Sequence, residues 1–66
     1  MTLQEKRMLD VGDYVLWLDP EDSISSNHHI IVSILTDSRR VENIDTILII
    51  QNDQGEYNEV IAAEIV

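Results

Sequence analysis

The 66-residue sequence contains no cysteine, and its apolar stretches fall well short of the ~18 residues that a membrane-spanning helix needs. The lack of cysteine excludes disulfide bonds and cysteine-type zinc sites. The charged N-terminal segment also lacks the apolar stretch of a signal peptide. These absences predict a soluble, cytoplasmic protein that does not contact a membrane.

Basic charge is scarce as well, because thirteen acidic residues face only four basic ones and the formal net charge is −9. Most of such a surface repels phosphate, so direct binding to DNA or RNA is not expected. The same charge supports an alternative hypothesis, an acidic decoy or inhibitor that mimics nucleic acid and binds a basic nucleic-acid-binding protein. The acidic surface of this alternative comprises Asp19, Glu21, Asp22, Asp53, Glu56 and Glu59.

Motifs for chemistry are also missing. No serine, cysteine or lysine stands beside a base in a recognisable catalytic motif. His28 and His29 are adjacent, and adjacent residues of a strand point to opposite faces, so we expect two solvated rings that do not share a metal. The acids over residues 19–22 lack the spacing of an EF-hand calcium loop. The sequence therefore predicts a protein that is not an enzyme and uses no cofactor or metal.

Local patterns predict one or two helical turns and five strands. Thr2 and Glu5 match a capping box, which favours helical turns over residues 2–9. Apolar runs bounded by turn residues predict strands over 14–18, 28–35, 44–51, 56–60 and 64–66, with a long loop over 19–27. The stretch "NDQG" (52–55) predicts a type I turn in which Gly55 takes a positive φ. The length fits a single domain over residues 1–66, with the helical turn in 1–10.

Two stretches carry a family resemblance. "VGDYVLW" (11–17) resembles the opening strand of Tudor domains, and "GEYNEVIAAEIV" (55–66) resembles their hairpin return and closing turn. This resemblance implies an all-β fold, a small five-stranded antiparallel SH3-like barrel over residues 11–66. Tudor domains that bind methylated residues hold them in an aromatic cage. The corresponding positions here are Asp19 and residues 51–53, none of them aromatic, so that ligand is not carried over.

The predicted strands are apolar on both faces, which is usual only where both faces are covered. Alternation and the Tudor resemblance assign to the core Val15, Trp17, Ile30, Val32, Ile34, Ile47 and Ile49. The apolar residues left outside are Tyr14, Leu16, Leu18, Ile31, Leu35, Leu48 and Ile50. Either the N-terminal Leu3, Met8 and Leu9 cover these residues, or a protein partner does.

The leading hypothesis is therefore a non-enzymatic protein-interaction module that uses this outer apolar set, with a second copy of the chain as one candidate partner. The dipeptide Arg39-Arg40 interrupts the acidic chain at a predicted turn. Its guanidinium groups either balance nearby acids or contact a partner's carboxylates.

Overall fold

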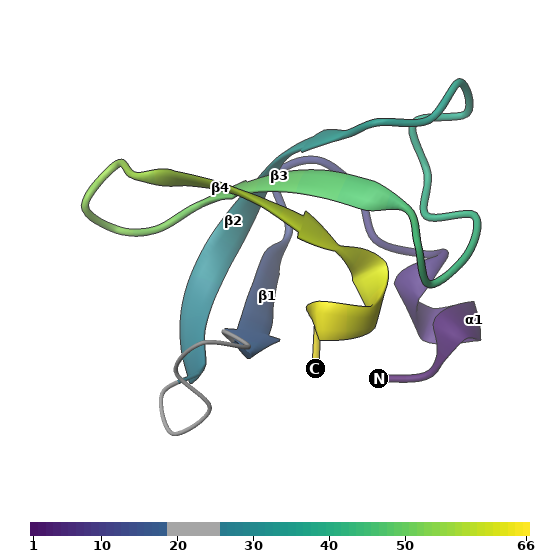
Figure 1. Cartoon of the computed structure of the whole chain (residues 1–66), viewed down its shortest axis with the longest axis horizontal. Coiled ribbons are helices and arrows are strands. Elements are labelled where there is room, and N and C mark those ends of the chain that lie inside the picture. Colours follow the sequence, from purple (N-terminus) through teal and green to yellow (C-terminus); the bar gives the residue numbers. More distant parts are fainter. Residues whose placement is uncertain (19–25) are drawn as a thin grey trace.

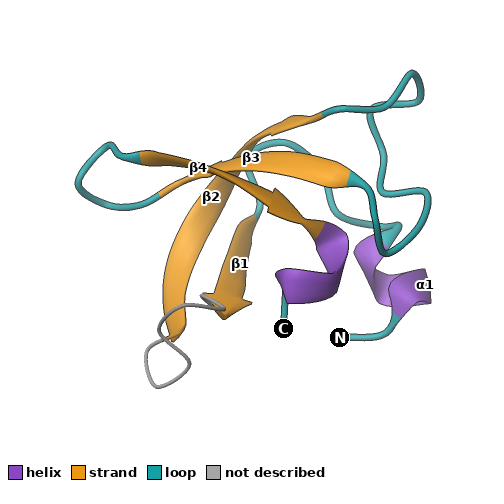
Figure 2. Cartoon of the chain, in the orientation of Figure 1, coloured by secondary structure: helices purple, strands orange, loops and turns teal. Residues whose placement is uncertain are grey.

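The computed structural model describes residues 1–18 and 26–66 (Figure 1). Its elements are α1 (Leu3–Lys6), β1 (Tyr14–Leu18), β2 (Ser26–Ile34), β3 (Ile47–Gln51), β4 (Tyr57–Ile61) and the 3₁₀ helix η1 (Ala62–Glu64). The four strands form one antiparallel sheet in the order β1-β2-β3-β4, which curls into a half-barrel (Figure 2). The all-β prediction is confirmed. Most of the loop predicted over 19–27 lies outside the described residues.

The fifth predicted strand is not a strand in the described part of the chain. Glu64 belongs to η1, and residues 65–66 contribute a single antiparallel bridge, between Ile65 and Trp17. The backbone N–H of Val66 also donates to the carbonyl oxygen of Leu16 at 2.9 Å. The chain end therefore reaches β1 without forming a ladder along it.

The N-terminal capping box is confirmed. The Glu5 N–H donates to Thr2 Oγ1 at 3.1 Å, and the Thr2 N–H donates to Glu5 Oε1 at 2.9 Å. Helix α1 is only four residues long. It is linked to η1 by a hydrogen bond in which Lys6 Nζ donates to the carbonyl oxygen of Ala62 at 2.8 Å. Figure 1 shows the two short helices next to each other beside the curled sheet.

The β3–β4 hairpin forms at the predicted turn. Asn52 Oδ1 accepts hydrogen bonds from the N–H groups of Gln54 and Glu56, and the Gly55 N–H donates to the carbonyl oxygen of Asn52. Gly55 has a φ of 85°, which L side chains rarely adopt. The turn fixes the register in which Gln51 lies opposite Tyr57 and Ile47 lies opposite Ile61.

A bulge in β2 changes which side chains face inward. The β2–β3 register shifts between Ile31, which lies opposite Ile50, and Ser33, which lies opposite Ile49. An extra residue in one strand interrupts the simple alternation of side chains. As a result Ile31 and Ile34, three residues apart, both face the core, and Val32 is exposed.

Three residues predicted to lie outside are in the core. Ile31 is 1 % exposed, and Leu48 and Ile50 are 0 % exposed. Conversely, Val32 and Ile47 are exposed, although alternation assigned them to the core. Both faces of β3 are apolar, so composition could not separate them. In β2 the bulge breaks the alternation on which the assignment rested.

The core forms one cluster on the inner side of the sheet. Its buried apolar residues are Leu9, Val15, Ile31, Ile34, Val41, Leu48, Ile50, Val60, Ala62 and Ile65. Leu3 and Trp17 are partly buried and pack against it. Three of these residues lie side by side across β2, β3 and β4, and we call them the inner row: Ile34, Leu48 and Val60.

Candidate functional site

The outer face of the sheet carries a second apolar row, one residue along the chain from the inner row. We call it the outer row: Leu35, Ile47 and Ile61. The Leu35 N–H donates to the carbonyl oxygen of Ile47 at 2.9 Å, and Ile47 lies opposite Ile61 in the β3–β4 register. The three side chains are 53 %, 37 % and 36 % exposed. All three therefore keep part of their surface in contact with solvent.

The other end of the outer face has aromatic side chains. Tyr14 lies opposite Ile30, which lies opposite Gln51, which lies opposite Tyr57. Both tyrosines are exposed, whereas Ile30 is half-buried.

Of the seven apolar residues that the sequence analysis left outside the core for a partner, four are accessible in the structure. Tyr14, Leu18 and Leu35 are exposed, and Leu16 is half-buried. Met8 is exposed, whereas Leu3 and Leu9 pack on the core, so the N-terminal segment closes the inner side of the sheet.

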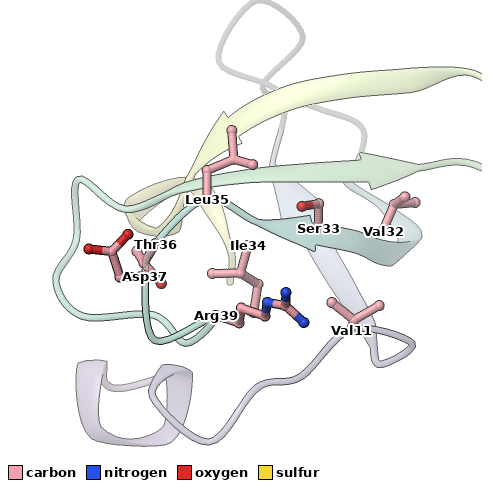
Figure 3. A pocket seen from close by; sticks show the side chains of 8 residues that line it. All are labelled: Val11, Val32, Ser33, Ile34, Leu35, Thr36, Asp37 and Arg39. Atoms are coloured by element: carbon pink, nitrogen blue, oxygen red, sulfur yellow. The ribbon is translucent and has the colours of Figure 1, made fainter.

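An open hollow of about 510 Å³ lies where the end of β2 passes the segment before β1 (Figure 3). Its apolar lining consists of Val11, Val32, Ile34 and Leu35. Its polar lining consists of Ser33, Thr36, Asp37 and Arg39. We call this hollow the edge groove.

The edge groove borders a part of β2 that has a neighbour on one side only. The Gly12 N–H donates to the carbonyl oxygen of Ile31, and the Ile31 N–H donates to that of Asp13. Gly12 then has a φ of 97°, and the register with β1 extends no further along β2 than these bonds. Beyond Ile31, β2 pairs only with β3, so one edge of residues 32–34 has no strand beside it in the described chain.

Among the described cations, Arg39 differs from the others. Lys6 and Arg7 donate to backbone carbonyl oxygens, those of Ala62 and Glu42. Arg40 lies 3.6 Å from the Asp10 carboxylate and also donates to the carbonyl oxygen of Leu9.

The Arg39 guanidinium has no ion pair or hydrogen bond within the described residues. Its backbone φ of 57° is unusual for a residue with a side chain. The sequence placed both arginines at a turn but could not distinguish the paired one from the unpaired one.

The two histidines have different surroundings. His28 is exposed, as predicted, but His29 is buried and packs edge-on against Trp17, with ring centroids 5.4 Å apart. The expectation of two solvated rings is wrong for His29 because the β1–β2 register places it opposite the buried Val15. The described residues contain no group of three or more side chains that could hold a metal ion.

The acidic residues of the alternative hypothesis divide into two groups. Asp53, Glu56 and Glu59 are exposed on the β3–β4 hairpin, and Asn52 Nδ2 donates to Glu56 Oε1 at 3.0 Å. Asp19, Glu21 and Asp22 lie outside the described residues.

Among the carboxylates of the described residues, that of Glu5 has a shifted pKa. Hydrogen bonds from the backbone and then the side chain of Thr2 lower the pKa of the Glu5 carboxyl.

Comparison with protein-family models, with curated proteins and with solved structures finds no match. Within the described residues no helix has the length and apolarity that a membrane crossing requires.

Proposed function

We propose that the chain is a non-enzymatic protein-interaction module that pairs with a second copy of itself through the outer row. The observation that carries the proposal is the exposure of three aligned aliphatic side chains on an open sheet face. Sheets that pack face to face bury rows of this kind between them. A two-fold contact suits the row, because the same patch then serves both copies.

The charge of the chain predicts how this association depends on salt. Each copy carries a formal charge of −9, so two copies repel each other at low ionic strength. Added salt screens this repulsion and leaves the apolar contact intact. The dimer is therefore tighter at high salt, which is opposite to the behaviour of a complex held by opposite charges.

Sedimentation equilibrium over a wide concentration range, at low and high salt, tests the proposal. Ile47→Glu introduces a charge into the outer row and abolishes the dimer. Met8→Glu adds the same charge at an exposed apolar residue outside the sheet and leaves the dimer in place. A wild-type chain that stays monomeric at every concentration overturns the proposal, as does a dimer that Ile47→Glu does not weaken.

The fold part of the proposal is an SH3-like barrel in which residues 64–66 stand at the position of a fifth strand. It is supported by the Trp17–Ile65 bridge and by the hydrogen bond from Val66 to Leu16. Slow amide exchange at Val66 supports a closed barrel. Exchange at the rate of an unstructured chain end contradicts it.

The acidic decoy is the second candidate, and the scarcity of neutralising contacts favours it. Among the described residues the single ion pair joins Arg40 to Asp10. The hairpin acids Asp53, Glu56 and Glu59 are left exposed. In this case a lysine-rich peptide binds tightly at low salt and is released at high salt. Neutralising the three acids to amides weakens that binding, and an unchanged affinity argues against the decoy.

A further inference from the structure

We propose that the edge groove binds an extended peptide segment of a partner protein, in which an aliphatic side chain and a carboxylate side chain stand two residues apart. This site goes beyond the self-association proposed above and shares only Leu35 with the outer row. The proposal stands on three features of the groove: a strand edge without a neighbouring strand, an apolar lining and a guanidinium without a partner among the described residues.

The strand edge supplies the backbone contact. Leu35 directs its N–H toward β3, where it donates to the carbonyl oxygen of Ile47. Backbone N–H groups of a strand alternate in direction, so the Ile34 N–H points away from β3, toward the side that β1 leaves open. An extended peptide laid along this edge accepts that hydrogen bond, as in recognition by strand addition.

The apolar lining can bind one aliphatic side chain of the peptide. Val11 and Val32 are both exposed and stand on opposite sides of the hollow, one from the segment before β1 and one from the β2 bulge (Figure 3). Ile34, which is buried, also lines the hollow. An aliphatic side chain that enters this space removes the two exposed valines from water.

Arg39 supplies the charge complementarity. Its guanidinium extends toward Val11, and Asp37 points away from it at the other end of the groove (Figure 3). A guanidinium without a partner in an acidic chain favours a carboxylate, which it can hold by two parallel hydrogen bonds. In an extended peptide, residues two apart point to the same side, so one segment can place its aliphatic group and its carboxylate in the groove together.

The net charge restricts the rest of the peptide. A chain of −9 repels a segment with several acids, so the one carboxylate that meets Arg39 is flanked by neutral or basic residues. Asp37 at the far end of the groove favours a basic flanking residue there. The structure thus selects a segment with one acid, one aliphatic residue and basic ends.

A short synthetic peptide tests this site. It is acetylated and amidated, with leucine and glutamate two residues apart, threonine between and around them, and lysine at both ends. Titration of the full chain, followed by amide chemical shifts, measures binding. We expect the largest shifts at residues 32–35 and Arg39, at peptide concentrations in the micromolar to millimolar range.

Matched variants separate the groove from general charge effects. Arg39→Gln weakens binding by about tenfold or more, because it removes a charged hydrogen-bond partner. Arg7→Gln removes the same charge from another surface and leaves the affinity nearly unchanged. A peptide with glutamine in place of glutamate loses affinity for the wild-type chain by a similar factor, which keeps the test informative if Arg39→Gln is poorly folded.

Three outcomes overturn the proposal. The first is that the peptide causes no chemical-shift changes. The second is that Arg7→Gln and Arg39→Gln weaken peptide binding equally. The third is that the shift changes centre on Ile47 and Ile61. The last outcome moves the peptide to the outer row and leaves the interaction-module proposal standing. A monomeric chain that still binds the peptide in the groove refutes self-association without affecting the groove.

Discussion

The residues of the inner row and of the outer row are neighbours in the chain and have similar side chains, yet one row is buried and the other is exposed. The inner row shares a single cluster with Leu9, Val41 and Ile65. The side chains of the outer row are just as apolar, but none of them belongs to this buried cluster of the described residues. The comparison shows that burial in this small sheet is decided by which segments pack over a face. Apolarity of the strand itself does not decide it.

The largest effect is expected from truncating the inner row. Leu48→Ala removes a fully buried side chain at the centre of the sheet and costs about 2–5 kcal/mol. A core in a domain of this size yields only about 3–5 kcal/mol, so the variant is mostly unfolded. Far-ultraviolet circular dichroism during a urea titration measures the loss.

The control is the neighbouring residue of the outer row. Ile47→Ala costs less than about 1 kcal/mol at protein concentrations where the chain is monomeric, because its side chain is already partly in water. Equal destabilisation by the two variants would mean that the two faces of β3 are not as different as their exposure indicates.

Much of the local structure is predictable from residues that act on their immediate neighbours. The Thr2–Glu5 capping box and the turn at residues 52–55 need only side chains within three or four positions of each other. The first strand is also predicted correctly, from Tyr14 to Leu18. Each of these patterns favours one local backbone conformation, and that conformation is compatible with the rest of the fold.

The assignment of faces could not be predicted in the same way. Residues 47–50 are all aliphatic, so either set of alternate side chains could face the core. The bulge at Val32 could not be predicted either, because no glycine or other turn residue marks it in the sequence. The edge groove brings together Val11 and Arg39, which are distant in sequence and meet only after β1 and β2 pair. The sequence did identify an unusual arginine pair. That Arg40 is the paired one depends on the position of Asp10, whose carboxylate lies 3.6 Å from it.

A second prediction concerns the loop that leads into β3 and so positions both rows. Thr46 is buried, and its Oγ1 accepts hydrogen bonds from the N–H groups of Glu42 and Asn43, each at 3.1 Å. Thr46→Val keeps the shape but leaves two donors unpaired, so we expect a loss of about 1–3 kcal/mol in urea unfolding.

Thr36, at the other end of the same loop, provides the matched control. Its Oγ1 accepts from the Arg40 N–H, but its side chain is only half-buried. Thr36→Val therefore costs less, because water replaces the lost partner. A larger effect at Thr36 than at Thr46 would contradict the view that burial sets the cost.

A third prediction tests the hairpin that keeps the two rows in register. Gly55→Ala places a side chain at a φ of 85°, which costs about 1 kcal/mol, and the nearest atom to the new Cβ is 3.8 Å away, so strain is the only penalty. Gly55→Asn recovers part of the loss because asparagine tolerates this conformation better. If alanine and asparagine are equally destabilising in thermal unfolding, backbone strain is not the cause.

The smallest effect is expected at the N-terminal turn, which helps to close the inner face. The pKa of Glu5 is lowered by the backbone and side chain of Thr2, so the contribution of this carboxylate to stability is present above the ordinary glutamate pKa. The contribution is lost as the pH falls through the lowered folded-state pKa, where the carboxyl becomes protonated.

Thr2→Val removes the hydroxyl but keeps the backbone N–H, so the pKa of Glu5 rises only part of the way toward its ordinary value. Thr2→Ser keeps the hydroxyl and leaves the pKa low. A carbon-detected NMR titration of the Glu5 carboxyl measures both. The same titration separates the causes: a pKa unchanged in Thr2→Val assigns the shift to the backbone hydrogen bond alone, and a full return to the ordinary value shows that α1 has unwound. In that second case the inner face loses part of its cover, and the leucines that dock on the core become accessible like the outer row.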